Sequence, residues 1–125
     1  TYASFEDQRD KLVNLLHQLA DMRIEPGRIT ILSPYRRENS VISLLDKISI
    51  RDFSIHENTS ITFCTIQAYK GIENTVIILT DIEDFSMDKL MYVGLSRARS
   101  GLYILESESA SKEYLTLLQR RLFRE

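Results

Sequence analysis

The sequence predicts an α/β fold, a three-layer sandwich around a mostly parallel β-sheet. Short β-branched runs alternate with stretches in which apolar residues recur at helical spacing, an order typical of strand–helix units in parallel sheets. One run, Thr75 to Thr80 (TVIILT), is apolar on both faces, as in strands covered on both sides. Polar clusters lie at or beside the strands, and parallel sheets bind ligands at the carboxyl ends of their strands.

The first predicted element is a helix from Phe5 to Met22. Its apolar stripe comes from leucines at helical spacing, namely Leu12, Leu15, Leu16 and Leu19. Ser4 is the predicted N-cap, and Asp7 completes a loose capping box and suits the positive end of the helix dipole. Glu25-Pro26-Gly27 then stops the helix and turns the chain.

A strand, a polar turn and a second helix are predicted next. Arg28 to Ser33 (RITILS) is a short β-branched run, and Pro34-Tyr35-Arg36-Arg37 follows it directly. The segment from Glu38 to Lys47 carries apolar residues at helical spacing and predicts a short amphipathic helix. We also expect a short edge strand near Phe53 to Ile55.

The second half predicts three strands and two helices. The strands are Ile61–Thr65, Thr75–Thr80 and Leu102–Leu105. The helices are Met87–Arg97, which Gly101 is expected to break from the final strand, and Ser109–Phe123. Residues 1–125 therefore form one predicted domain, without an internal repeat or linker.

Composition places the chain among soluble globular domains, with 43% hydrophobic and 27% charged residues. A net charge of -2 gives no overall positive field, so any nucleic-acid contact must be local. The single Cys64 excludes an internal disulfide and is expected to be a buried, inert thiol. No membrane span or signal peptide is evident, which predicts a cytoplasmic location and no membrane partner. Thr1 in place of Met indicates processing or an excised fragment.

Three polar clusters carry the predicted chemistry. Tyr35-Arg36 directly follows a strand, although Pro34 also suits an ordinary turn. The second cluster is TIQAYKGIE, from Thr65 to Glu73, in which glycine allows a tight turn next to a ligand. Its lysine and glutamate could equally form a solvated pair.

The third cluster is YVGLSRAR, from Tyr92 to Arg99. The planar, permanently charged guanidinium of Arg97 suits a γ-phosphate. A simpler alternative is that Arg97 and Arg99 decorate the end of a helix, where the dipole favours cations.

In this order and spacing, TIQAYKGIE and YVGLSRAR resemble motifs V and VI of the UvrD/Rep-like superfamily 1 helicases, and SPYRRE resembles the PYR version of motif IV. The resemblance covers about Arg28 to Glu106 and implies a RecA-like domain, the second of two motor domains. No G-x-x-x-x-G-K-[ST] phosphate loop occurs. An N-terminal phosphate-loop domain of the same protein would therefore be a partner of this one. That domain would supply most of the ligands of the Mg²⁺ ion.

The resemblance also implies a role for individual residues. Tyr35 would stack on the adenine of ATP, and Arg36 and Arg97 would be the catalytic residues that reach its γ-phosphate. Glu73 would hydrogen-bond the ribose, and Gly71 would let the backbone turn tightly beside the nucleotide. The residues implied to contact single-stranded DNA or RNA are Thr65, Gln67 and Lys70. Gln67 stands where many relatives carry histidine or aspartate.

The implied function is that of the C-terminal motor domain of an ATP-dependent DNA helicase or translocase, inactive by itself. Only Arg37 to Ser60 separates motifs IV and V, so the helical domain usually inserted there is missing or minimal. One alternative is a degenerate helicase-like domain that only binds nucleic acid or protein. Another is an unrelated α/β enzyme or receiver domain, but RITILSPYRR lacks the acids that a receiver needs after its first strand.

No metal site is predicted. The segment from Thr75 to Glu83 imitates a magnesium-binding strand, yet no phosphate loop precedes it. His17 and His56 have no metal-ligand partners at useful spacing and are expected to be structural or solvated.

Overall fold

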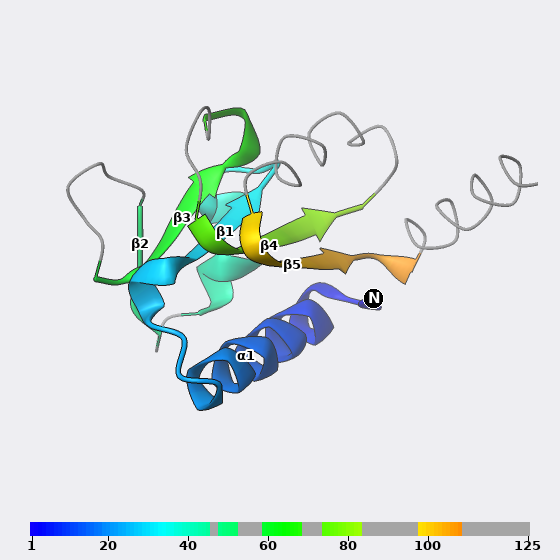
Figure 1. Ribbon diagram of the computed structural model, residues 1–125. Coiled ribbons are helices and arrows are strands. Elements are labelled where there is room, and N and C mark those ends of the chain that lie inside the picture. Colours follow the sequence, from blue (N-terminus) through cyan, green and yellow to red (C-terminus); the bar gives the residue numbers. More distant parts are fainter. Residues whose placement is uncertain (46–47, 53–58, 69–73, 84–97, 109–125) are drawn as a thin grey trace, which may run out of the picture.

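The structure is a computed structural model that describes residues 1–45, 48–52, 59–68, 74–83 and 98–108. Within them, one sheet holds five strands in the order β2-β3-β1-β4-β5, and each neighbouring pair is parallel (Figure 1). The main elements are α1 (Phe5–Asp21), β1 (Ile29–Ser33), β2 (Ile50–Asp52), β3 (Ile61–Thr65), β4 (Asn74–Ile82) and β5 (Ala98–Glu106). The predicted α/β fold with a parallel sheet is confirmed.

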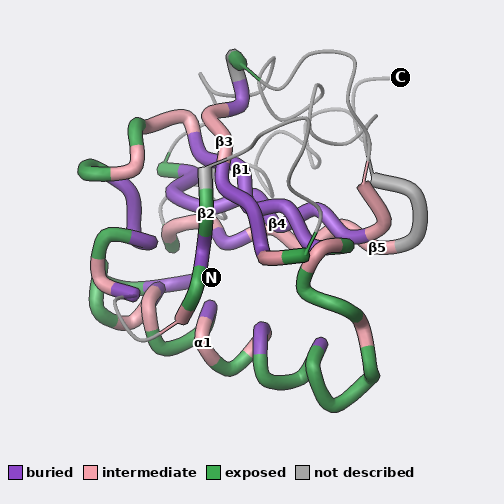
Figure 2. The backbone as a smooth tube through the Cα atoms, turned by 90° about the vertical axis from the view of Figure 1, so that its left-hand side faces the viewer, coloured by how far each residue is buried: buried purple, intermediate pink, exposed green. Residues whose placement is uncertain are grey.

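Helix α1 begins and packs as its sequence predicts. The Ser4 hydroxyl accepts from the Asp7 N–H at 3.1 Å, and the Asp7 carboxylate accepts from the Ala3 N–H at 2.9 Å, which is a variant of the reciprocal capping box. The helix lies along one face of the sheet (Figure 1). Along α1, the buried positions lie on the side of the helix nearer the sheet and the exposed positions on the far side (Figure 2); the buried residues are Gln8, Leu12, Leu16 and Leu19.

Both faces of the sheet carry a hydrophobic cluster. Along β4, Val76 and Ile78 join the cluster that includes the α1 leucines, whereas Ile77 and Leu79 join a second cluster with Leu32, Ile66 and Ile82. Successive strand residues point to opposite faces, so burial of all these side chains means that both faces are covered. This confirms what the run TVIILT predicts.

One local prediction is wrong, and a second cannot be compared with the structure. The described part of the predicted helix Glu38–Lys47 consists instead of two 3₁₀ turns, Arg37–Asn39 and Val41–Leu44. Ser40 separates them because its backbone is extended, with φ -92° and ψ 161°, and its side chain caps the second turn. The described edge strand is β2, which pairs with β3 from Ile50↔Ile61 to Asp52↔Phe63; the strand predicted near Phe53 to Ile55 lies outside the described residues and stays a prediction.

The last strand is longer than predicted. β5 begins at Ala98 and pairs with β4 from Asn74↔Ala98 to Ile82↔Glu106. Gly101 lies within it, opposite Val76, so this glycine does not separate a helix from the strand. The predicted helices Met87–Arg97 and Ser109–Phe123 lie outside the described residues.

The N-terminal segment is fastened to the end of β5. The Tyr2 N–H donates to the Glu106 carbonyl at 2.9 Å, the Glu108 N–H donates to the Tyr2 carbonyl at 3.1 Å, and Tyr2 forms a parallel bridge with Ser107. α1 therefore starts close to the carboxyl end of the sheet. Across the described ranges, none of the helices has the length and apolar character needed to cross a membrane.

Candidate functional site

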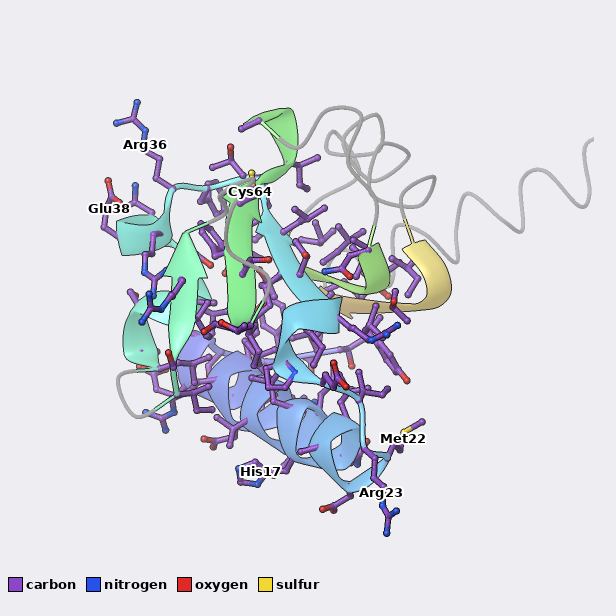
Figure 3. All side chains as sticks on the ribbon, turned by 60° about the vertical axis from the view of Figure 1, so that its left-hand side comes forward. His17, Met22, Arg23, Arg36, Glu38 and Cys64 are labelled. Carbon is purple, nitrogen blue, oxygen red and sulfur yellow. The ribbon has the colours of Figure 1, made fainter. Side chains whose placement is uncertain are left out.

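The carboxyl ends of β1 and β3 lie side by side, because Ser33 of β1 is in register with Thr65 of β3. The chain leaves β1 through Pro34, Tyr35 and Arg36, and leaves β3 through the 3₁₀ turn Ile66–Ala68. Figure 3 shows Arg36 and Cys64 at this end of the sheet. Two of the predicted polar clusters thus begin at the carboxyl end of the sheet, which we call the carboxyl edge.

Tyr35 is fixed at two points, whereas Arg36 reaches into solvent. The half-buried Tyr35 donates its hydroxyl to Glu83 Oε2 at 2.9 Å, and its N–H donates to Ser33 Oγ at 3.1 Å. The Arg36 side chain is exposed and extends away from the sheet (Figure 3). The edge therefore presents a held aromatic ring next to a solvent-facing cation.

A single buried carboxylate holds both ends of the loop that carries these two residues. The loop is Pro34–Asn39, and serines flank it on each side. Asp81, 1% exposed, accepts on Oδ2 from Ser33 Oγ at 2.7 Å and from Ser40 Oγ at 2.5 Å. Its other oxygen, Oδ1, accepts from the Val41 N–H at 3.0 Å. We call Asp81 with Ser33 and Ser40 the Asp81 clasp.

The clasp is also joined to α1 and to its own strand. Gln8, fully buried, donates through Nε2 to Asp81 Oδ1 at 3.1 Å and accepts from the Asp81 N–H at 2.7 Å. Thr80 Oγ1 lies 3.1 Å from Asp81 Oδ2. Asp81 has a left-handed backbone, with φ 61°, where the pairing of β4 with β5 shifts register. Aspartate tolerates this conformation better than most residues.

Sequence reasoning missed the clasp. It compared the acids after TVIILT with a magnesium-binding strand and set them aside, but donors of the chain itself occupy both oxygens of Asp81. The available signal was an acid in a strand buried on both faces, since a buried charge must be paired. Over the part of the chain that the structure describes, no three His, Cys, Asp or Glu residues are grouped to hold a metal ion.

The remaining predicted site residues are only partly described. Thr65 is half-buried at the end of β3, and the backbone of Gln67 lies in the turn that follows. Gly71, Glu73, Lys70 and Arg97 lie outside the described residues, so their roles stay predictions. The strands that come next in the sequence, β4 and β5, both start at the amino edge of the sheet.

Three other side chains can be placed. His17 is exposed on α1, as expected of a solvated histidine, and Cys64 is half-buried rather than buried. Tyr2 lies near the clasp. Burial, and after it the charges of Asp81 and Glu83, raises the Tyr2 pKa well above its ordinary value, and the buried hydroxyl has no hydrogen-bond partner within the described structure.

Comparisons with known proteins agree with this architecture. The family described as "AAA domain" matches residues 3–109. The chain belongs to this family. The AAA domain is also similar in structure to the C-terminal domain of a possible DNA helicase from Lactobacillus plantarum WCFS1, with a TM-score of 0.64 and 16% identity over 86% of this chain and 71% of the other. That similarity supports the fold. No curated protein matches the sequence.

Proposed function

We propose that this AAA domain is the second motor domain of an ATP-dependent DNA helicase or translocase of the UvrD/Rep-like superfamily 1 type. The observation that carries the proposal is the pairing of Ser33 with Thr65, which starts the motif IV-like and motif V-like segments at one edge of a parallel sheet. Ligands bind at this edge in open α/β sheets. The structural similarity of this chain to the C-terminal domain of a possible DNA helicase supports the same function.

The described residues at this edge fit a nucleotide. A held, half-buried tyrosine ring suits a purine base, and the solvent-facing guanidinium of Arg36 suits a phosphate. We assign Tyr35 to the adenine and Arg36 to the γ-phosphate of ATP. Gly71, Glu73 and Arg97, which precede the amino ends of β4 and β5, are assigned to the nucleotide from the motif resemblance alone. Mg²⁺, which neutralises charge on the phosphates during transfer, would be held mainly by the phosphate-loop domain.

Single-stranded DNA or RNA is the second proposed ligand. Thr65, Gln67 and Lys70 are the assigned contacts, and contacts of this kind to the phosphate backbone are independent of base sequence. ATP bound between this domain and the phosphate-loop domain would draw the two together, and hydrolysis would release them. Each cycle would move the domain along the strand. The isolated domain would not hydrolyse ATP, since it lacks the phosphate loop.

The test compares two exposed arginines in the full-length protein. Arg36→Gln removes the proposed phosphate contact, and Arg23→Gln removes an exposed arginine that follows α1 (Figure 3). We expect Arg36→Gln to lower DNA-stimulated ATP turnover by about 10³-fold or more, as for an arginine that stabilises a transferring phosphoryl group. Arg23→Gln should keep the wild-type rate.

Equal rates in the two variants would contradict the assignment of Arg36. A full-length protein that binds single strands but shows no ATP turnover would also contradict the motor function. That second result would indicate the binding module instead.

A further inference from the structure

We propose that Asp81 is a positioning residue for the nucleotide: by holding Ser33 and Ser40, it fixes the loop Pro34–Asn39 and presents Tyr35 and Arg36 to ATP. This inference rests on the proposed function and adds to it a residue that lies outside the helicase-like motifs. Asp81 is buried, so it acts through the loop rather than by touching the ligand.

The clasp holds the two ends of the loop close together. The two serines stand at opposite ends of a six-residue loop, yet both donate to the same oxygen, at 2.7 and 2.5 Å. A loop whose ends are held together samples fewer conformations than one whose ends are free. A ligand that binds the ordered loop therefore loses less free energy in ordering it.

Ser33 transmits this constraint to Tyr35. Its hydroxyl donates to Asp81 and at the same time accepts from the Tyr35 N–H at 3.1 Å. The far end of the tyrosine is bonded to Glu83, two residues after Asp81. Hydrogen bonds thus link both the backbone and the ring of Tyr35 to residues at the end of β4.

Asp81 itself is held in an unusual conformation. Its left-handed φ of 61° is costly for a residue other than glycine and persists where the surroundings enforce it, often at functional sites. Gln8 of α1 supplies that enforcement by bonding both the backbone N–H and the carboxylate of Asp81. The clasp is therefore built on a rigid helix and strand, as a precise binding loop requires.

The experiment uses two buried hydroxyls of β1 in the full-length protein. Ser33→Ala removes the hydroxyl that bonds both Asp81 and the Tyr35 N–H, and Ser33→Thr restores a hydroxyl. Thr30→Val is the matched control, because Thr30 is also fully buried in β1 but bonds Thr62 Oγ1 at 3.0 Å and Asn74 Nδ2 at 2.8 Å, away from the loop. The readouts are KM and kcat for ATP, the urea midpoint, and hydrogen exchange of the loop amides.

We expect Ser33→Ala to raise the KM for ATP about tenfold, because the binding-competent loop conformation becomes less populated, and to speed exchange of the Tyr35 amide. Thr30→Val should lower the urea midpoint about as much as Ser33→Ala does. It should change neither the KM for ATP nor the exchange rate of the Tyr35 amide. Ser33→Thr should recover most of the wild-type KM.

Two failures can be told apart. If Ser33→Ala and Thr30→Val have equal KM values while Arg36→Gln abolishes turnover, the positioning role is overturned and the proposed function stands. If Arg36→Gln turns over ATP at the wild-type rate, the proposed function fails, and the role of Asp81 in nucleotide binding fails with it. Wild-type exchange of the Tyr35 amide in Ser33→Ala would also overturn the positioning role.

Discussion

At the scale of single residues, Asp81 organises more of the candidate site than any motif residue that the structure describes. Burying a carboxylate is strongly unfavourable unless donors surround it. Here the donors come from α1, β1, β4 and the 3₁₀ turn after the loop, namely Gln8, Ser33, Thr80, Ser40 and Val41. Truncation of Asp81 would remove the acceptor of these donors, of which, within the described residues, Thr80 alone keeps another, the Leu32 carbonyl at 3.1 Å.

Asp81→Ala should therefore lower the free energy of unfolding by about 3 kcal/mol or more, because each buried donor left without an acceptor costs about 1–3 kcal/mol. The neighbouring Glu83→Ala is the control: its side chain is exposed, and surface substitutions usually change stability by less than ~1 kcal/mol. Urea denaturation of the purified protein measures both values. Similar losses for the two variants would show that the Asp81 network contributes little to stability.

Tyr2 gives a second prediction at this scale. Its buried hydroxyl lacks a partner in the described structure, so Tyr2→Phe should leave the free energy of unfolding unchanged or raise it by up to ~1 kcal/mol at neutral pH. Above pH 10.0, the ordinary pKa of the phenol, the unfolded chain releases this proton while the folded chain keeps it, so stability falls as pH rises.

Denaturation at pH 7 and at pH ~11 tests this pair of statements. Tyr2→Phe should lose less stability between the two values than the wild type does. A marked loss at neutral pH would mean that the hydroxyl has a partner.

At the scale of elements, the strands and α1 could be predicted because their signals are local. Apolar runs and the spacing of leucines set where each element lies and which face is buried. The two 3₁₀ turns, Arg37–Asn39 and Val41–Leu44, could not be predicted, since Ser40 between them bonds Asp81, 41 residues away. The position of β2 depends in the same way on its pairing with β3.

The capping box of α1 predicts a pH dependence. The Ala3 N–H, more than any other contact, holds the Asp7 pKa below its ordinary value of 3.8. The stability that this carboxylate adds is present above that value and is lost as the pH falls through the lowered pKa of the folded state. Asp7→Asn should therefore flatten the acid limb of the stability curve in urea denaturation from pH ~6 to ~2.

Ser4→Ala should lower stability by about 1 kcal/mol at neutral pH, because it removes the hydroxyl that accepts from Asp7. An acid limb that Asp7→Asn leaves unchanged would exclude the proposed role of this carboxylate.

Burial of both faces of β4 makes a further prediction. Ile77 and Ile78 are both fully buried but belong to different clusters. Each change to alanine should therefore cost about 2–5 kcal/mol, as for truncation of other core residues. A sheet with one open face would instead give a large loss at Ile78 and almost none at Ile77, and chemical denaturation of the two variants distinguishes these cases.

At the scale of the whole molecule, the parallel sheet explains why distant motifs could be expected to meet. Tyr35 follows β1 and Thr65 ends β3, and these two strands are neighbours in register, so motifs placed at strand ends meet at the carboxyl end of the sheet. The Asp81 clasp could not be found from motifs, because its parts come from positions 33, 40 and 81 and only the fold brings them together. Contacts from Glu73 and Arg97 to the same nucleotide remain predictions.

The most direct test of the central claim is to locate a bound adenine. The full-length protein can be labelled with 8-azido-ATP under light and the modified peptide identified by mass spectrometry. We predict labelling of the peptide that contains Tyr35, with loss of the label in excess ATP and in Tyr35→Ala. Labelling confined to other segments, or unaffected by ATP, would contradict the assignment of this loop to the nucleotide.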